Sequence, residues 1–293
     1  MERSLIALPQ EKHWYIILTG KPSSKERISV MAKNIVIITG ASSGIGKEFA
    51  LQMDPYFQSI DEFWLIARSK DKLKELAASL KHPTKILAMD LTNEAQIERL
   101  TDTLKDHDAI IRVLINCAGY GLMGNADAID IPGQLGMVRL NCEALTHVTL
   151  SCLPFLKKGS HIIQLASSAA FLPQPSFAVY AASKSYVLSF SRALGAELSE
   201  KGIYVTSVCP GPVDTPFFDI AEKGGTTLAV KQLTMVSPKR VVRQALLDSA
   251  RHKTMSICSL PIKAFFLVSK FLPTSLLLSI VLRMKKAQKN KHR

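Results

Sequence analysis

Two side chains that can transfer protons, Tyr180 and Lys184, stand four residues apart in a segment with helical periodicity at 178–199. Side chains at this spacing share one face of a helix, so both can point into one cleft. A free phenol has a pKa of about 10, and a neighbouring ammonium favours the phenolate and lowers that pKa. The spacing therefore indicates a tyrosine that acts as general acid and base on a carbonyl or alcohol oxygen.

A glycine-rich turn, Thr39-Gly-Ala-Ser-Ser-Gly-Ile-Gly46, lies between an apolar run at 35–39 and a helical segment at 44–53. Glycines let the backbone approach a pyrophosphate closely, and the free N–H groups at a helix N-terminus face its charge. The strand before the turn and the helix after it favour a nucleotide site over a plain tight turn. We expect cofactor contacts from Gly40, Ser42, Ser43, Gly44, Ile45 and Gly46.

The elements that must position these residues alternate along the chain. Apolar runs predict strands at 35–39, 63–67, 85–89, 111–116, 160–166 and 203–209. Helical segments lie between them near 44–53, 70–80, 93–106, 134–153 and 178–199. This rhythm predicts an α/β fold, a doubly wound parallel sheet of Rossmann type, in a single domain over 31–255. A hydrophobic helical extension is expected at 256–293.

Several motifs agree in order and spacing with one family. Beside the glycine-rich turn and Tyr180-x-x-x-Lys184, the sequence has Asn-Cys-Ala-Gly at 116–119 and Pro-Gly-Pro-Val at 210–213. Over about 31–250 the chain resembles the short-chain dehydrogenase/reductase family in its single-domain branch, with Cys117 where the family has a second asparagine. The resemblance implies the strand order 3-2-1-4-5-6-7. It also implies a hydride transfer between a nicotinamide cofactor and a carbonyl or secondary alcohol.

The resemblance assigns four catalytic positions: Asn141, Ser167, Tyr180 and Lys184. Ser167 corresponds to the serine that hydrogen-bonds the reacting oxygen; Ser168 is adjacent, but the spacing to Tyr180 favours Ser167. Asn141 corresponds to the asparagine that holds a relay water near the lysine. The lysine would also bind the nicotinamide ribose. Further cofactor contacts are implied at Asp90, Leu91, Asn116, Ala118, Gly119, Pro210, Gly211, Val213 and Thr215, together with Tyr180 and Lys184.

The end of the second predicted strand bears on the choice of cofactor. Members that select NAD place an acidic residue there to bind the ribose 2′-hydroxyl. This chain has Arg68 instead, followed by Ser69 and Lys70. A guanidinium matches a 2′-phosphate in charge and geometry, so we expect NADP(H) rather than NAD(H). The alternative is a surface arginine that opens a charged helix.

The sequence gives less information about the substrate than about the cofactor. A loop from Thr215 through Phe217 and Phe218 to Gly225 should cover the site, and its phenylalanines favour an apolar ketone, although such residues often only pack. The family suggests a hydroxysteroid, a bile acid or a 3-ketoacyl compound. A non-catalytic nucleotide sensor on the same fold is the alternative, but Ser167, Tyr180 and Lys184 are all present. A sugar-nucleotide epimerase would show a different glycine spacing.

Positive charge is concentrated at one end of the chain. The net charge is +13, yet residues 223–293 hold 15 Lys and Arg against one acid, Asp248, which leaves a net −1 elsewhere. After Pro261, two short amphipathic segments separated at Pro273 precede a basic tail, a pattern typical of in-plane binding to an anionic membrane through 260–293. The alternative is that their apolar faces roof the cleft or form a dimer contact, with the tail solvated.

The sequence also bears on metal ions, nucleic acids, the compartment and self-association. No C-x-x-C pair occurs among the five cysteines, so no metal is expected. No zinc or aromatic-interleaved pattern supports nucleic-acid binding. Residues 1–30 carry none of the motifs; they form a leader, or Met31 is the true start. An odd number of cysteines without a signal-peptide pattern favours a cytoplasmic protein, peripherally attached to a membrane if the tail binds one. We also expect a homo-oligomer.

Overall fold

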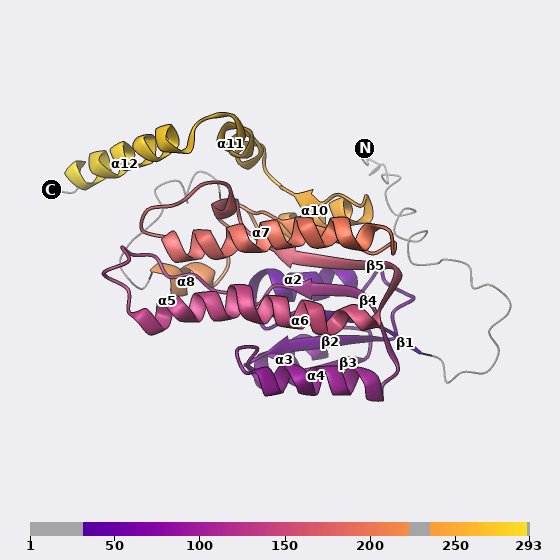
Figure 1. Ribbon diagram of the computed structural model, residues 1–293. Helices are drawn as coiled ribbons and strands as arrows, with labels where there is room; N and C mark the ends of the chain where they lie inside the picture. The colour runs from indigo at the N-terminus through magenta and orange to yellow at the C-terminus, as the bar shows by residue number, and fades with distance from the viewer. Residues whose placement is uncertain (1–31, 223–234, 292–293) are drawn as a thin grey trace, which may run out of the picture.

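A seven-stranded parallel sheet forms the centre of the protein, as the computed structural model of residues 32–222 and 235–291 shows (Figure 1). The strand order β3-β2-β1-β4-β5-β6-β7 confirms the order that the family resemblance implied. The strands are β1 (Lys33–Thr39), β2 (Glu62–Ala67), β3 (Thr84–Ala88), β4 (Ala109–Asn116), β5 (Leu156–Leu165), β6 (Tyr204–Val208) and β7 (Met255–Ser256). The two-residue β7 has no apolar run long enough to be predicted.

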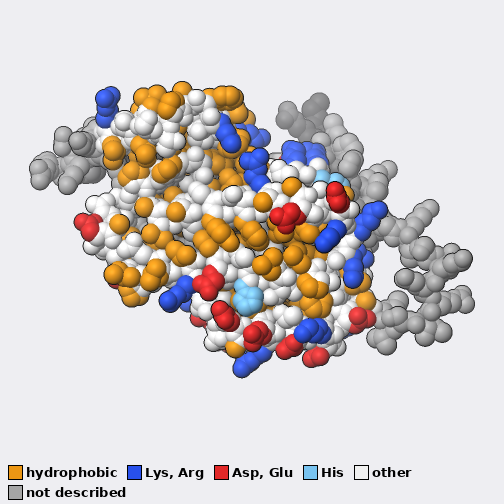
Figure 2. All heavy atoms as spheres, viewed as in Figure 1, with side chains coloured by type: hydrophobic (Ala, Val, Ile, Leu, Met, Phe, Trp, Pro, Cys, Tyr) orange, Lys and Arg blue, Asp and Glu red, His pale blue; other side chains and the backbone are white. Residues whose placement is uncertain are grey.

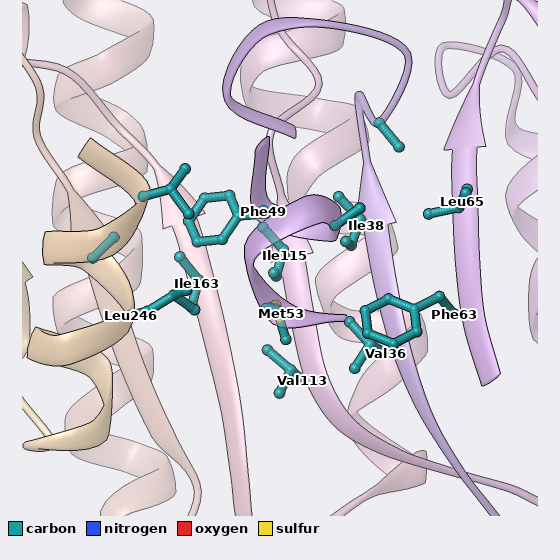
Figure 3. Packing of buried hydrophobic residues seen from close by; sticks show 14 of the residues in the cluster. Val36, Ile38, Phe49, Met53, Phe63, Leu65, Val113, Ile115, Ile163 and Leu246 are labelled. Atoms are coloured by element: carbon teal, nitrogen blue, oxygen red, sulfur yellow. The ribbon is translucent and has the colours of Figure 1, made fainter. Parts of the chain in front are cut away.

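The continuous apolar runs form strands because both faces of the sheet are covered. In β1, Val36 and Ile38 face one core cluster, whereas Ile35 and Ile37 face the other. All four side chains are fully buried. Figure 3 shows Val36 and Ile38 beside Phe49 and Met53.

Helices cover both faces of the sheet, which confirms the doubly wound α/β class. One core cluster includes side chains of α2 (Gly44–Met53), α3 (Lys70–Ala78) and α10 (Pro238–Ala250). The other includes side chains of α4 (Glu94–Asp106), α6 (Leu145–Cys152) and α7 (Ala178–Ser199). Short turns η2 (Leu153–Phe155) and η3 (Ser168–Phe171) flank β5, and α8 (Phe217–Ala221) follows β6.

The helix predicted at 134–153 is longer and less regular than expected. It begins earlier, as α5 (Ile131–Val138), passes through a π-helical turn η1 (Arg139–Ala144) and continues as α6. The wider turn buries Asn141, Cys142 and Ala144. Such π-turns inside helices are frequent at functional sites.

All seven strands are parallel, so their carboxyl ends meet at one edge of the sheet. The chain reverses its direction of winding between β1 and β4, where open α/β sheets bind ligands. At this point the Thr39 Oγ1 accepts hydrogen bonds from the backbone N–H groups of Cys117 (3.1 Å) and Ala118 (3.2 Å). These bonds tie the end of β1 to the loop after β4.

The C-terminal extension consists of two helices, α11 (Leu260–Phe271) and α12 (Thr274–Lys291). The first ends before Pro273 and the second begins after it. The domain boundary expected at 255/256 falls inside β7, and α11 rests on the domain: the rings of Phe171 and Phe266 lie 4.9 Å apart. Among the residues that the structure describes, no helix is long and apolar enough to cross a bilayer. The predicted leader at 1–30 lies outside the described residues.

Candidate active site

A cavity of about 1050 Å³ opens at the carboxyl edge of the sheet. Every residue that the sequence assigned to the cofactor lines it, except Asn116, and so does Ser167 of the catalytic set. Residues from seven separate segments between Gly40 and Thr215 therefore converge on one space. Such convergence of a nucleotide turn with a Ser, Tyr and Lys set is what a hydride-transfer site requires.

The glycine-rich turn fits a nucleotide. Gly40 has φ +67°, and a Cβ at this position would stand 2.7 Å from the backbone nitrogen of Ala118. A Cβ at Gly46 would collide with the carbonyl oxygen of Gly40. The N-terminus of α2 begins here, and its N-cap Ser43 makes no side-chain capping bond. The helix N-terminus is therefore available for a phosphate.

Tyr180 lies in the wall of the cavity, with only 7% of its surface exposed. Its ring stacks on Phe177, with centroids 4.2 Å apart, and is tilted against Phe217 at 5.4 Å. Burial raises the pKa of Tyr180 to about 12, and a hydrogen bond with the Ser167 side chain acts in the opposite direction. The two hydroxyls that were assigned to the reacting oxygen are thus in contact.

Lys184 occupies the same helix face, as its spacing predicts, and its side chain is buried. Its Nζ donates a hydrogen bond to the carbonyl oxygen of Leu165 (2.7 Å) and lies 5.7 Å from the centroid of the Tyr180 ring. Burial lowers the pKa of Lys184 to about 8. We expected the ammonium and the positive nicotinamide ring together to lower the pKa of Tyr180. Among the residues of this chain alone, desolvation of the phenol is the larger effect and raises that pKa.

Asn141 and Asn116 lie behind the cavity wall. The Asn141 side chain accepts from the Tyr120 N–H (3.1 Å) and donates to the Tyr120 carbonyl (2.9 Å) and to the Ser183 Oγ (3.0 Å). The Asn116 amide donates to the Thr149 Oγ1 (3.0 Å) and is buried. In this structure both side chains hold backbone and helices in place rather than face the cavity.

The end of the cavity beside β2 carries positive charge. Arg68 and Lys72 both line it and are exposed to solvent. Asp90 is the one acidic side chain of the described lining, and it accepts hydrogen bonds from the N–H (3.0 Å) and Oγ1 (2.8 Å) of Thr92. These bonds and the charge of Arg68 hold the pKa of Asp90 below its usual value.

Comparison with known proteins identifies the family. The sequence profile described as short chain dehydrogenase matches residues 34–224. The chain belongs to the short-chain dehydrogenase/reductase family. An uncharacterised oxidoreductase of Staphylococcus epidermidis is 34% identical over 194 residues, which cover 66% of this chain and 83% of that protein.

Solved structures agree with this assignment. A short-chain dehydrogenase from Sphingobium yanoikuyae in complex with NADPH has a TM-score of 0.69 and 29% identity, over 80% of this chain and 91% of that one. A short-chain dehydrogenase/reductase from Burkholderia phymatum in complex with NAD shares the fold, with a TM-score of 0.71 and 20% identity over 82% and 94% of the two chains. The protein is thus an oxidoreductase that acts on a small molecule with a nicotinamide nucleotide.

This short-chain dehydrogenase has lining residues that sequence reasoning missed. Lys72 could have been found, because it stands four residues after Arg68 at the start of a helix. The contributions of Tyr120 and Met123 had no local signal. Ile262 belongs to the segment that the sequence offered, as an alternative to membrane binding, as a roof of the cleft. Ile262 in particular reaches the cavity from the C-terminal extension, where its side chain lies against Gly211.

Proposed function

We propose that this short-chain dehydrogenase uses NADP(H) and interconverts an apolar ketone and its secondary alcohol. One observation carries the proposal: a single cavity has Arg68 and Lys72 at one end and Tyr180 among aromatic side chains at the other. The first end suits a phosphorylated ribose and the second an apolar carbonyl compound.

The choice of NADP(H) rests on charge. A ribose 2′-phosphate is recognised by arginine and lysine, whereas a free 2′-hydroxyl is recognised by a carboxylate. Arg68 directly follows β2, and Lys72 lies one helical turn further along. The nearest acid in sequence, Asp71, is outside the cavity lining and lies 3.6 Å from Lys74. The N-cap of α3, Ser69, lines the cavity without a side-chain capping bond.

The catalytic step follows from the protonation of Tyr180. A nicotinamide bound in this cavity would give a hydride to the carbonyl carbon, or take one from the alcohol. With its pKa raised by burial, Tyr180 holds its proton at neutral pH and can donate it to the carbonyl oxygen in reduction. The Ser167 hydroxyl, hydrogen-bonded to the phenol, would hydrogen-bond the same oxygen. The Lys184 Nζ, bonded to the Leu165 carbonyl, lies 5.7 Å from the centroid of the Tyr180 ring, and with a pKa of about 8 it is mostly protonated at neutral pH.

The apolar substrate is supported by the walls around Tyr180. Phe177, Phe217 and Phe218 line this end with Met123 and Leu172. Two of these rings, Phe177 and Phe217, pack directly against the ring of Tyr180. Binding of a hydroxysteroid, a bile acid nucleus or a 3-ketoacyl chain would bury apolar surface against these rings.

We also propose that the protein forms a homo-oligomer and is located in the cytoplasm. Exposed Leu150 and Tyr186 lie on α6 and α7, which the hydrogen bond between Thr146 Oγ1 and Tyr186 Oη (2.7 Å) joins. This apolar surface supports a homo-oligomer formed through these two helices. All five cysteines are free, which supports the cytoplasm. Sedimentation equilibrium of the protein and of Leu150→Asp tests the assembly: an unchanged mass would refute this interface.

Fluorescence titrations with NADPH and NADH test the cofactor. Arg68→Asp should weaken NADPH binding at least about tenfold, because a charge-assisted bond to the phosphate is lost. NADH binding should not weaken. Lys74→Asp makes the same charge change outside the cavity and should leave both affinities unchanged. If the unchanged protein prefers NADH, the assignment of Arg68 is wrong.

A panel of steroid, bile-acid and 3-ketoacyl ketones, followed by the absorbance of NADPH, tests the reaction. Tyr180→Phe retains the ring stack on Phe177 but lacks the transferable proton. Its turnover should fall at least about a hundredfold, with little change in the affinity for NADPH. Turnover at the rate of the unchanged protein would refute the role of Tyr180. If only charged, short aldehydes or ketones react, the apolar substrate class is wrong.

A further inference from the structure

The two C-terminal helices present an apolar surface to solvent. Of the 16 large hydrophobic side chains that are exposed in the described residues, eight lie within 260–282. They include Leu260, Leu267, Val268, Phe271, Leu276 and Ile280. Figure 2 shows hydrophobic side chains gathered at the top of the molecule, where Figure 1 places α11 and α12. We call this the C-terminal apolar surface; its size calls for a partner.

The charge around this surface indicates the kind of partner. Residues 249–293 contain ten Lys and Arg and no Asp or Glu. Lys263, Lys270 and Arg283 are exposed on the same two helices. A second copy docked face to face would bring these cations together with no carboxylate of the segment to neutralise them. An anionic lipid surface complements both the apolar side chains and the charge.

The same helices form part of the substrate cavity. Ile262, Phe265 and Val281 line it from α11 and α12. Phe265 and Phe266 also contact the ring of Phe171, with centroids 6.1 and 4.9 Å away. One side of each helix therefore faces the cavity, while other positions of the same helix expose apolar side chains to solvent.

We propose that α11 and α12 lie in the plane of an anionic membrane and form the wall through which an apolar ketone passes between lipid and the cavity. The docking itself needs only the C-terminal apolar surface and its cations. The passage of a ketone rests on the proposed function. Exchange through this wall would spare an apolar substrate from crossing water.

Sedimentation of the full-length protein with vesicles tests the docking without any turnover. Vesicles of phosphatidylglycerol and phosphatidylcholine should carry the protein down, whereas phosphatidylcholine alone should bind it at least about tenfold more weakly. Raising NaCl from about 0.05 M to about 0.5 M should release it, because salt screens the lysines and arginines. Protein that stays in the supernatant with anionic vesicles would overturn the proposal.

A matched pair of variants distinguishes the effect of the C-terminal apolar surface on vesicle binding from the effect of the net charge. Phe271 is 81% exposed and Tyr56, on the loop after α2, is 63% exposed. Phe271→Glu should lower the partition coefficient at least about tenfold, because an apolar ring that enters the lipid is replaced by an anion. Tyr56→Glu changes the charge equally, removes an aromatic ring elsewhere and should lower partition less than threefold. Equal losses would overturn the assignment of the surface.

Folding and self-association are read on the same samples. Both variants should melt within a few degrees of the unchanged protein and bind NADPH as it does, because neither residue lines the cavity. Leu267→Glu provides a second variant at another exposed position of α11. If Phe271→Glu and Leu267→Glu reduce the mass in sedimentation equilibrium while vesicle binding is unchanged, the surface is a contact between copies and the lipid proposal is wrong.

Delivery is tested with a ketone that the panel shows to be reduced and that partitions into bilayers. Anionic vesicles should raise its rate of reduction, or at least maintain it, in the unchanged protein and depress it in Phe271→Glu, which binds the lipid at least about tenfold more weakly. With a water-soluble ketone, vesicles should affect neither protein. Equal inhibition of both proteins by vesicles would refute delivery, whereas sedimentation would still report docking, and the panel would still report the reaction.

Discussion

Replacing Asn141 by alanine should loosen the cavity wall rather than remove a reacting group. The Asn141 amide makes three hydrogen bonds, two to the backbone of Tyr120 and one to Ser183, from a position with no solvent exposure. The neighbour of Tyr120, Gly119, lines the cavity, and a Cβ on it would meet the Asn141 Oδ1 at 2.8 Å. The loop that closes the cofactor end of the cavity therefore depends on this amide.

The magnitude follows from those bonds. At about 1 kcal/mol for each intramolecular hydrogen bond, Asn141→Ala should lower the free energy of unfolding by about 3 kcal/mol. For a domain of this size, that corresponds to a fall in Tm of about 6–12 °C. Ser183→Ala retains both bonds to Tyr120. It loses the two bonds of its own hydroxyl, to Asn141 and to the Tyr180 carbonyl, and should cost about 2 kcal/mol. Because the loop shifts, KM for NADPH should rise in Asn141→Ala more than kcat falls.

Urea unfolding and steady-state kinetics on both variants check this reasoning. The expected pattern is the larger loss of stability with a raised KM for the cofactor in Asn141→Ala, and a smaller loss in Ser183→Ala. If Asn141→Ala lowers the free energy of unfolding by less than about 1 kcal/mol while kcat collapses at unchanged KM, the structural account is refuted. Asn141 would then act near the reacting atoms, as the relay role that the family resemblance implied.

Two further predictions concern the nucleotide turn and pH. Gly46→Ala should weaken nucleotide binding at least about tenfold in a fluorescence titration, because its Cβ would collide with the Gly40 carbonyl. The control is Gly195→Ala on α7, whose Cβ would meet the Val205 side chain at 3.3 Å; this variant should bind the nucleotide normally. Equal losses of affinity in the two variants would refute the role of the glycine-rich turn. Burial lowers the pKa of His161 to about 4, against about 6.5 in the unfolded chain. Between these two pH values the unfolded state binds more protons than the folded state. The free energy of unfolding therefore falls as the pH is lowered through this window, by up to about 3 kcal/mol. Urea unfolding between about pH 4.5 and 7.5 measures this dependence; His161→Phe should flatten it, and an unchanged slope would contradict the assignment.

The local chemistry of the site was determined by the sequence. The apolar run of β1, the glycine-rich turn after it and the four-residue spacing of Tyr180 and Lys184 each depend on residues close together in the chain. Backbone geometry converts such spacing directly into a shared face or a tight turn. The parallel sheet followed from the alternation of strands and helices, whereas the order of its strands came from the family resemblance.

The electrostatics of the site were decided by the tertiary structure. The sequence predicted a lowered pKa for Tyr180 from its distance to Lys184 along a helix. The opposite shift arises from burial of the phenol, against which the rings of Phe177 and Phe217 pack. Desolvation depends on every element that surrounds a group, so no local pattern could report it.

The same limit explains which lining residues were missed and why the partners of Asn141 could not be predicted. Asn141 lies in the predicted helix, but its wider π-turn and the partners of its amide, 21 and 42 residues away, exist only after folding. Ile262 reaches the cavity because the chain returns over η3 after β7. The sequence alone left open whether the C-terminal helices roof the cleft or bind a membrane. Folding places Ile262 in the cavity wall and exposes Phe271 on the same helix, so the proposed membrane contact and the wall of the cleft can share one segment.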